Sequence, residues 1–382
     1  MAELTTNSVS IQRVRDRRSL SNTPLRRLFE TAVKYEASDL LIRGGQVPKL
    51  RLRGDLKSLD VEALDDDEFE AWIEEGISDA QWDMYARLGA LDVGVDIELS
   101  DGSTHRFRVN VYRTRGRSGL AARRVGSEIL NFDELHLPPI LARVAEHQQG
   151  LVLVVGITGS GKSTSLASMI QHINKHRPCH IVTLEDPIEY IFQDDQALIS
   201  QREIGIDVPD FSSGLRSLVR EDPDVVLIGE MRDKETFETA LQASETGHLV
   251  FGTIHASSAS QAFGRIYDLF SPEEREGIRN MLAYQMQAFV YQKLLPTIRK
   301  DIQRVPAVEI LLQSANTRKY ILEGREHELE EVIRANREAG MQTFTDHLVQ
   351  LVEDQYIHPK VAQASATSPE EVRMRLRGIK AE

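Results

Sequence analysis

The stretch from residue 151 to residue 170 constrains this chain most, because a short apolar run ends abruptly at a glycine-rich loop. Residues 151–155 are typical of a buried parallel strand, and apolar residues at helical spacing resume from about Lys162. Between them, residues 156–163 (GITGSGKS) match G-x-x-x-x-G-K-[ST]. Glycines let backbone N–H groups converge on a phosphate, and the helix N-terminus adds its positive end. The stretch therefore predicts a phosphate-binding loop and a nucleotide ligand.

Two residues of this loop have separate expected roles. Lys162 can reach the β- and γ-phosphates of the nucleotide, and the Ser163 hydroxyl can ligate Mg²⁺. ATP and Mg²⁺ are therefore the expected ligands. The complete set of nucleotide-contacting residues predicted from the loop is Gly156, Thr158, Gly159, Ser160, Gly161, Lys162, Ser163 and Thr164.

Length, charge and cysteine content exclude several classes of protein. The 382 residues suffice for two domains with cores of their own. A net charge of −13 argues against generic attraction to nucleic acid, so no direct nucleic-acid partner is expected. The single cysteine, Cys179, excludes a disulfide framework and a multi-cysteine zinc site. Apolar runs are too short to span a bilayer and the N-terminus is polar, so we expect a soluble, cytoplasmic protein without a transmembrane segment or signal peptide.

Changes of pattern along the chain predict its organisation. Residues 1–22 lack periodicity and are predicted to be a mobile tail, and residues 23–125 to form a small mixed α+β domain. Residues 126–139 are the expected linker. From 140 to 382 strands alternate with helices, which predicts an α/β fold with a parallel sheet and helices on both faces. Strands are expected near 151–155, 180–184, 225–229, 248–254 and 305–311, and a long amphipathic helix at 273–294.

Carboxylates at predicted strand ends are candidates for the chemistry. Glu230 follows the apolar run 225–229 in a Walker B-like arrangement that lacks the usual aspartate, so it is the candidate base that orients water. Glu185, in the segment 184–190 (LEDPIEY), follows another strand. The residues alone leave two interpretations of that segment open, a Mg²⁺–water network or a capped turn with solvated acids.

Two histidines flank the strand predicted at 248–254. His248 and His255 are seven residues apart, so on a strand they point to opposite faces and cannot chelate one metal ion directly. His255, at the strand end, is a candidate to sense or polarise the γ-phosphate, although a lone histidine is more often a satisfied polar residue. In the first domain, arginines concentrate shortly before the linker. They are Arg106, Arg108, Arg113, Arg115, Arg117, Arg123 and Arg124.

Taken together, these motifs resemble the secretion-type hexameric ATPases, and among them the type IV pilus retraction (twitching motility) ATPases, the PilT/PilU-like family. The resemblance runs from Ser38 to the C-terminal helices. It is carried by the segments 37–56 (ASDLLIRGGQVPKLRLRGDL), 106–112 (RFRVNVY), 156–163, 184–190, 200–205 (SQREIG), 215–233 (LRSLVREDPDVVLIGEMRD), 245–256 (ETGHLVFGTIHA) and 340–344 (GMQTF).

The resemblance implies a homohexameric ring whose subunits each pair a PAS-like N-terminal domain with a RecA-like motor domain that hydrolyses ATP. Glu185 falls in the family's Asp box and would hold the Mg²⁺–water network, while Glu230 would be the catalytic base. His248 and His255 match the His box, with His255 near the γ-phosphate. The arginines that match those presented to bound nucleotide by the family's N-terminal domain are Arg108 and Arg123.

The implied function is a motor that drives pilus retraction, bound peripherally to the inner membrane through a pilus platform protein and acting with or without a paralogous ATPase. Two alternatives stay open: a motor of the same fold for secretion or conjugation, and a weakly active accessory ring subunit that modulates a sister motor. The segment 315–324 matches the family's AIRNLIRE segment only loosely. A nucleic-acid translocase fits least, because the chain is acidic and has few aromatic residues.

Overall fold

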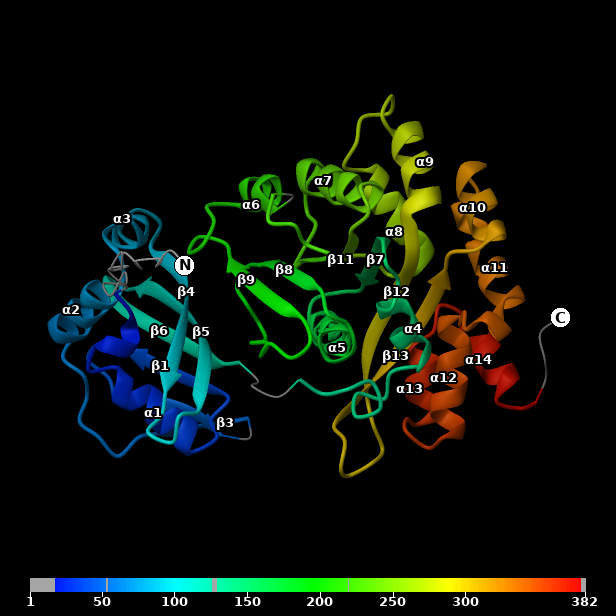
Figure 1. Cartoon of the computed structure of the whole chain (residues 1–382). Helices are drawn as coiled ribbons and strands as arrows, with labels where there is room; N and C mark the ends of the chain where they lie inside the picture. The colour runs from blue at the N-terminus through cyan, green and yellow to red at the C-terminus, as the bar shows by residue number, and fades with distance from the viewer. Residues whose placement is uncertain (1–17, 53, 126–128, 219, 379–382) are drawn as a thin grey trace, which may run out of the picture. The chain divides into compact units, whose positions relative to one another are not determined.

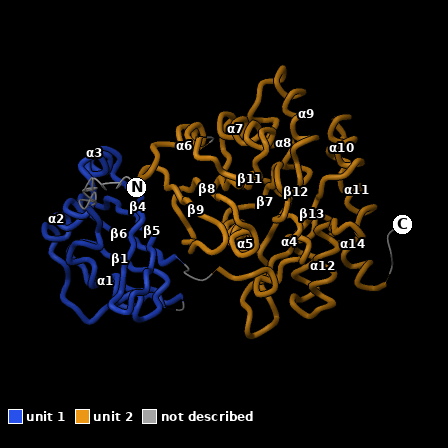
Figure 2. Tube along the Cα trace, in the orientation of Figure 1, with its two compact units in different colours: residues 1–127 blue, residues 128–382 orange. Residues whose placement is uncertain are grey.

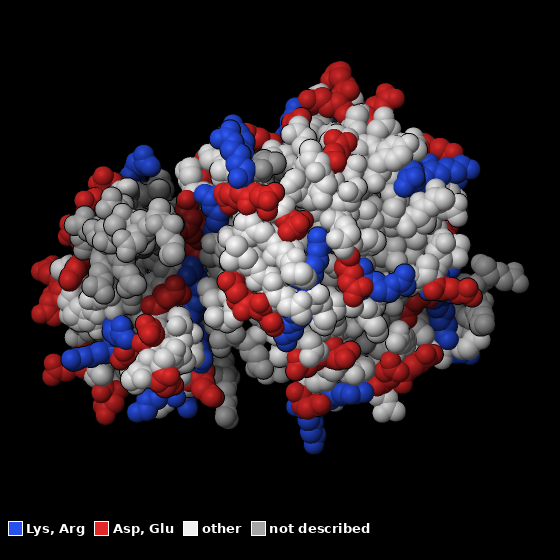
Figure 3. All heavy atoms as spheres, viewed as in Figure 1, with Lys and Arg blue, Asp and Glu red and all other residues white. Residues whose placement is uncertain are grey.

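The computed structural model describes residues 18–378 except 53, 126–128 and 219. Its elements fall into two compact units, residues 1–127 and 128–382 (Figure 2). Within the described residues, no helix is both long and apolar enough to cross a membrane. Figure 3 shows acidic and basic side chains interspersed on the face in view.

The first unit is built on a six-stranded sheet in the order β3-β2-β1-β6-β5-β4, with every paired neighbour antiparallel (Figure 1). Its strands are β1 (Asp39–Arg43), β2 (Lys49–Leu52), β3 (Asp55–Ser58), β4 (Ala90–Glu98), β5 (Thr104–Thr114) and β6 (Arg117–Arg124). Its helices are α1 (Arg26–Lys34), α2 (Asp66–Gly76) and α3 (Asp79–Leu88).

Alternating side chains explain why this sheet has one covered face. Val93, Val95 and Ile97 on β4 are buried, while the residues between them are exposed or half-buried. Phe29 of α1 stacks edge-on against Phe107 of β5, with the ring centroids 5.0 Å apart. The sheet therefore buries a single apolar core beneath α1–α3.

The predicted start of this unit and the predicted linker need correction. Residues 1–17 of the predicted tail lie outside the described residues, but Leu20 is buried in the core of the first unit. The unit therefore begins before residue 23. In the predicted linker, residues 126–128 are not described, whereas Phe132 and Leu137 pack into the core of the second unit. That part of the linker belongs to the second unit, because it buries apolar side chains there.

The second unit contains a seven-stranded sheet in the order β13-β12-β7-β11-β10-β8-β9. Its strands are β7 (Gly150–Val155), β8 (His180–Glu185), β9 (Leu198–Glu203), β10 (Val225–Ile228), β11 (Leu249–Ile254), β12 (Met286–Pro296) and β13 (Arg304–Leu312). All neighbours are parallel except β13, which runs antiparallel to β12 at the edge.

Helices cover both faces of this sheet (Figure 1). They are α4 (Ile140–Ala145), α5 (Lys162–His176), α6 (Phe211–Leu218), α7 (Lys234–Glu245), α8 (Ala259–Tyr267), α9 (Arg275–Gln285), α10 (Ala315–Leu322), α11 (Leu329–Ala335), α12 (Phe344–Glu353), α13 (Pro359–Ser365) and α14 (Pro369–Arg375). On β7, Leu151 and Leu153 belong to one apolar core and Val152 and Val154 to another. A strand buried on both faces is the reason why residues 151–155 are uniformly apolar.

The predicted long helix at 273–294 is wrong in its second half. The helix α9 ends at Gln285, and β12 starts at Met286 between β7 and β13. Phe289 and Val290 fit a helical spacing with Ile278 and Leu282, but they are buried in the cores on opposite faces of the sheet. A central strand reads as a continuous apolar run, so periodicity alone did not distinguish it from the preceding helix.

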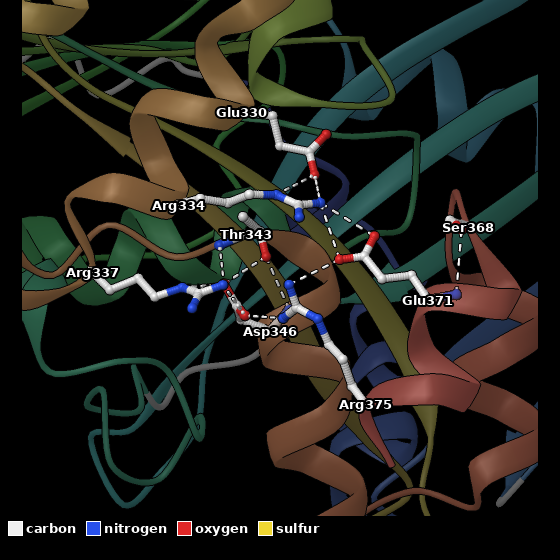
Figure 4. Close-up of polar contacts among 8 residues, drawn as sticks. All are labelled: Glu330, Arg334, Arg337, Thr343, Asp346, Ser368, Glu371 and Arg375. Carbon is white, nitrogen blue, oxygen red and sulfur yellow. Dashed lines mark hydrogen bonds and ion pairs between the residues drawn. The ribbon is translucent and has the colours of Figure 1, made fainter. Parts of the chain in front are cut away.

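An ion-pair network holds the C-terminal helices together (Figure 4). Arg375 on α14 pairs with Asp346 on α12 and with Glu371, one turn before it. Arg334 on α11 pairs with the same Glu371 at 3.0 Å and with Glu330 at 2.7 Å. Three helices that are separate in sequence are therefore joined by alternating charges.

Candidate active site

Four parallel strands bring the predicted site residues to one edge of the second sheet. The loop at 156–161 follows β7, His255 follows β11, Glu230 lies two residues beyond β10, and Glu185 is the last residue of β8. The registers pair Val155 with Ile254, and Ile228 with both Gly252 and Leu184, so these strand ends are level. The carboxyl ends of parallel strands are where open α/β sheets bind their ligands.

The glycines of the loop are required by its backbone. Gly159 and Gly161 have φ angles of 77° and 88°, in the left-handed region. Gly161 is also the N-cap of α5, where no side chain accepts a hydrogen bond from the first turn. The unpaired N–H groups of a helix N-terminus, together with its dipole, suit an anionic ligand. A loop of this shape can present backbone donors to an anionic ligand.

Lys162 is folded back onto this loop. Its Nζ donates hydrogen bonds to the carbonyl oxygens of Gly156 (2.8 Å) and Ile157 (3.2 Å). Burial lowers the pKa of this lysine, while the negative charge of Glu230 opposes that shift. The charge of Lys162 is therefore held at the loop by two neutral acceptors. Thr158 and Gly159 are exposed, and Ser163 and Thr164 are half-buried in the first turn of α5.

Glu230 is held between two cationic or polar side chains. Arg232 Nη2 lies 2.6 Å from its Oε2, and His255 Nε2 lies 3.0 Å from its Oε1. The hydrogen bond from Arg232 is the main cause that lowers the pKa of Glu230, against the opposing effect of burial. Glu230 is therefore an ionised carboxylate at neutral pH. Thr253 Oγ1 donates to the carbonyl of Gly229 at 2.7 Å, which ties the end of β10 to β11.

Glu185 is the most buried carboxylate of this group, with 7% of its surface exposed. Its Oε1 accepts hydrogen bonds from Thr183 Oγ1 (2.7 Å) and from Gln201 Nε2 (3.2 Å). Burial raises its pKa, and these hydrogen bonds act in the opposite direction. Nearby, the hydroxyls of Tyr190 and Thr164 are 2.8 Å apart, which connects the segment after β8 to the first turn of α5.

His248 does not join this group. It lies just before β11, where its carbonyl accepts from Gly150 N at the start of β7 (3.0 Å), and its Nδ1 lies 2.9 Å from the carbonyl oxygen of Ala243. His255 lies seven residues further along, just after β11, which at about 3.3 Å per residue places it about 23 Å from His248. Within one chain the structure therefore does not bring His248 to Glu230 and His255, because the two histidines stand at opposite ends of β11, and a catalytic role for His248 stays a prediction.

The two arginines predicted from the first unit are on neighbouring strands of that unit. Arg108 on β5 is exposed and is in register with Arg123 on β6. Arg123 Nε is 3.0 Å from Asp39 Oδ1, and its side chain is 76% exposed. The structure thus places both on the surface of their own unit.

Several supporting residues were assigned no role from the sequence. Thr183 and Gln201 orient Glu185, and Tyr190 contacts Thr164. Arg232 contacts Glu230, a pairing that the structure shows. Gln292 on β12, 2% exposed, contacts the loop through its side-chain amide. Gln201 and Gln292 act from neighbouring strands that only the folded chain brings together, and a polar residue inside an apolar run was the one available hint for Gln292.

The chemistry of the assembled site is limited to a few functions. It contains backbone donors and a lysine for phosphates, an ionised carboxylate beside a histidine, and a buried carboxylate with oriented oxygens. Within the described residues, no group of three or more His, Cys, Asp or Glu side chains could hold a metal ion by itself. These are the parts that phosphoryl transfer from a nucleotide to water requires.

Comparisons with known proteins agree with this geometry. A family described as "Type II/IV secretion system protein" matches residues 20–373. The type IV pilus retraction ATPase PilT of Pseudomonas aeruginosa is 37% identical over 343 residues, which cover 90% of this chain and 98% of that protein. The type IV pilus ATPase PilU of the same organism is 34% identical over 351 residues, covering 92% and 91%.

A solved structure is similar over the same length. The crystal structure of the pilus retraction motor PilT with bound ADP has a TM-score of 0.82 and 36% identity. The match covers 90% of this chain and 97% of that one. The likeness therefore extends to both units of the chain and is not confined to the phosphate-binding loop.

Proposed function

Because this chain belongs to the type II/IV secretion system protein family, we propose that it is a P-loop ATPase that powers retraction of a type IV pilus. The family and the relatives support an ATPase, and the match along 98% of a pilus retraction ATPase supports a role in retraction. The observation that carries the proposal is the Glu230 carboxylate, held between Arg232 and His255 at the same sheet edge as the phosphate-binding loop.

The proposed reaction is hydrolysis of the γ-phosphate of ATP. The oxygen of a water molecule bonds to the γ-phosphorus, the bond from phosphorus to the bridging oxygen breaks, and ADP is the leaving group. The ionised Glu230 orients the water and takes its proton. His255 contacts Glu230 and follows β11, the strand between β10 and β7, which carries the loop. From there it can sense whether a γ-phosphate is present.

The loop residues bind and neutralise the phosphates in this proposal. Lys162 exchanges the carbonyls of Gly156 and Ile157 for phosphate oxygens, which replaces two neutral acceptors by charged ones. The N–H groups from Gly159 to Thr164 surround the phosphates. ADP binding is known for the solved relative, which is described with that nucleotide bound.

The residues present also fit Mg²⁺. This ion is usually held by one or two protein oxygens together with phosphates and waters, so a cluster of several carboxylates is not required. We assign the Ser163 hydroxyl as the direct ligand and Glu185 as the carboxylate that orients the ion's waters. Bound there, Mg²⁺ would neutralise charge on the β- and γ-phosphates. Thr183 and Gln201 keep the Glu185 carboxylate in one orientation.

We further propose that the chain acts as a homohexamer at the cytoplasmic face of the inner membrane, bound through a pilus platform protein. In this ring, Arg108 and Arg123 supply positive charge to a nucleotide, so that hydrolysis depends on the position of the first unit. Both arginines are on the surface of that unit, which supports such a role. Arg123 would have to leave Asp39 to take it.

A paired measurement tests the enzymatic proposal. Purified wild-type protein should elute as a hexamer and hydrolyse ATP, whereas Glu230→Gln should bind ATP with little turnover, a loss of about 100-fold or more. Glu245→Gln is the control, because Glu245 is an exposed carboxylate at the other edge of the sheet and its substitution should leave turnover unchanged. Equal turnover in Glu230→Gln and wild type would refute the assignment of the base.

The proposed role in pilus retraction is tested in cells. Expression of the wild-type chain in a bacterium that lacks its own retraction ATPase should restore twitching motility, and Glu230→Gln should not. A wild-type protein that binds ATP and forms rings without turnover, but accelerates a sister motor, would replace this proposal by that of an accessory subunit. The similarity to PilU makes that comparison necessary.

A further inference from the structure

Gln292 bridges two parts of the phosphate-binding apparatus from the neighbouring strand. It lies on β12 one residue beyond Tyr291, which is in register with Val155 at the end of β7. Its side-chain Nε2 donates to the carbonyl oxygen of Ser160 in the loop (2.8 Å), and its Oε1 accepts from Ser165 Oγ on α5 (2.7 Å). Both ends of the amide are satisfied, in a side chain that is 2% exposed.

The bond to Ser160 fixes the direction of one peptide group. In a planar trans peptide, the C=O of one residue and the N–H of the next point in opposite directions. The Ser160 carbonyl points to Gln292, so the N–H of Gly161 points away from Gln292. Gly161 has a φ of 88°, and a glycine without a fixing contact can adopt many other backbone conformations.

Gln292 packs closely against the two glycines that delimit the loop. A Cβ atom on Gly161 would lie 2.7 Å from Gln292 Nε2, and one on Gly156 would lie 2.5 Å from the backbone oxygen of Gln292. The two glycines that delimit the loop are therefore both in contact with the same residue of β12. The second contact, from Ser165, ties the same amide to the helix that carries Lys162 and Ser163.

From this geometry we propose that Gln292 is a positioning residue that holds the Ser160–Gly161 peptide in its phosphate-binding orientation. The inference rests on the proposed nucleotide-binding function. Loss of the donor lets this peptide rotate, which removes one N–H from the phosphate. The cost falls on nucleotides with a β-phosphate and appears as weaker binding and a higher KM.

Three variants separate positioning from simple core packing. Gln292→Met keeps the length of the side chain without a donor. Gln287→Met is the matched control: Gln287 is on the same strand, its Nε2 donates to the Gln149 carbonyl at 3.1 Å, and it packs against Gly150 at the opposite end of β7. Gln292→Glu keeps size and the acceptor for Ser165, and regains a donor only when its carboxyl is protonated.

The experiment is calorimetric titration of the full chain with ADP and Mg²⁺, together with Tm in the absence of nucleotide. We expect Gln292→Met to bind ADP about 10- to 100-fold more weakly, the effect of losing one hydrogen bond to a charged group, and Gln287→Met to change affinity less than twofold. Burial should raise the pKa of the introduced carboxyl in Gln292→Glu, so its affinity should recover as pH falls from 8 to 6.

The outcomes are distinguishable. Wild-type affinity in Gln292→Met would overturn the inference, as would weakening in both methionine variants in proportion to their loss of Tm. A pH-independent deficit in Gln292→Glu would show that the donor is not what matters. If the wild-type chain itself does not bind ADP, the proposed function fails instead.

Discussion

Two buried titratable residues next to each other in the fold predict opposite pH dependences of stability. Glu309 on β13 is 8% exposed and accepts a hydrogen bond from Ala259 N at 2.8 Å. His347 on α12 is 5% exposed, and its Nδ1 accepts from Val308 N at 2.9 Å. Burial raises the pKa of Glu309 from 4.5 to about 7 and lowers that of His347 from 6.5 to about 4.

The signs follow from which state binds more protons. For Glu309 the folded chain keeps its proton to higher pH than the unfolded chain, so stability falls as pH rises from 4.5 to 7. For His347 the unfolded chain binds the proton more tightly, so stability falls as pH drops from 6.5 to 4. At about 1.4 kcal/mol per pKa unit, each contribution is about 3 kcal/mol, and the two slopes cancel between pH 4.5 and 6.5.

Single substitutions should expose each slope. Relative to wild type, Glu309→Gln should gain about 3 kcal/mol on going from pH 4.5 to pH 7, because it lacks the penalty of an ionised buried carboxylate. His347→Asn should gain about 3 kcal/mol relative to wild type on going from pH 6.5 to pH 4. The differences between variant and wild type matter here, because they cancel the titration of every other group.

Urea unfolding followed by circular dichroism at several pH values measures these differences. Tryptophan fluorescence supplies an internal control, because the two tryptophans of the chain, Trp72 and Trp82, both lie in the first unit and should report unchanged unfolding. If the free-energy difference between Glu309→Gln and wild type is the same at pH 4.5 and pH 7, the reasoning about the buried carboxylate is refuted.

Three further predictions concern single substitutions. Arg375→Met leaves two largely buried carboxylates, Asp346 and Glu371, without the cation that they share, so it should lower the free energy of unfolding by about 2–3 kcal/mol. Arg373→Met, on the exposed side of the same helix, should change it by less than about 0.5 kcal/mol. Thermal or urea unfolding measures both, and equal effects would contradict a stabilising role for the network. Gly161→Ala should lower the free energy of unfolding by about 1–3 kcal/mol more than Gly159→Ala does, measured by thermal unfolding without nucleotide. Both glycines have positive φ, but only a Cβ on Gly161 would lie against Gln292. Similar losses in the two variants would show that the loop relaxes around the added Cβ. Arg232→Gln removes the main cause of the low pKa of Glu230, so the acid limb of the profile of kcat against pH should move to higher pH, and an unmoved limb would exclude Glu230 as the titrating base.

The phosphate-binding loop was predictable because its signal is local. A buried strand, glycines at positions of positive φ and a lysine opening a helix all lie within a dozen residues. The family resemblance and the α/β fold class are confirmed by the match to residues 20–373 and by the TM-score of 0.82. The clustering of Glu185, Glu230 and His255 followed from the rule that parallel strands end at one edge. The hydrogen-bond and ion-pair partners of these residues could not be predicted, because the sequence pattern does not give the order of the strands in the sheet.

Two of the supporting side chains, Gln201 and Gln292, lie on strands that the sequence patterns missed. The strand β12 was predicted as the second half of a helix, and it carries Gln292. The edge strand β9 was not predicted, and it carries Gln201, which orients Glu185. Motifs identify groups whose proposed chemistry demands particular residue types. The groups that hold them in place are ordinary amides and hydroxyls, and only neighbouring strands give them that role. We therefore infer that substitutions on β9 and β12 perturb this site as specifically as substitutions in the phosphate-binding loop, although neither strand was predicted from the sequence.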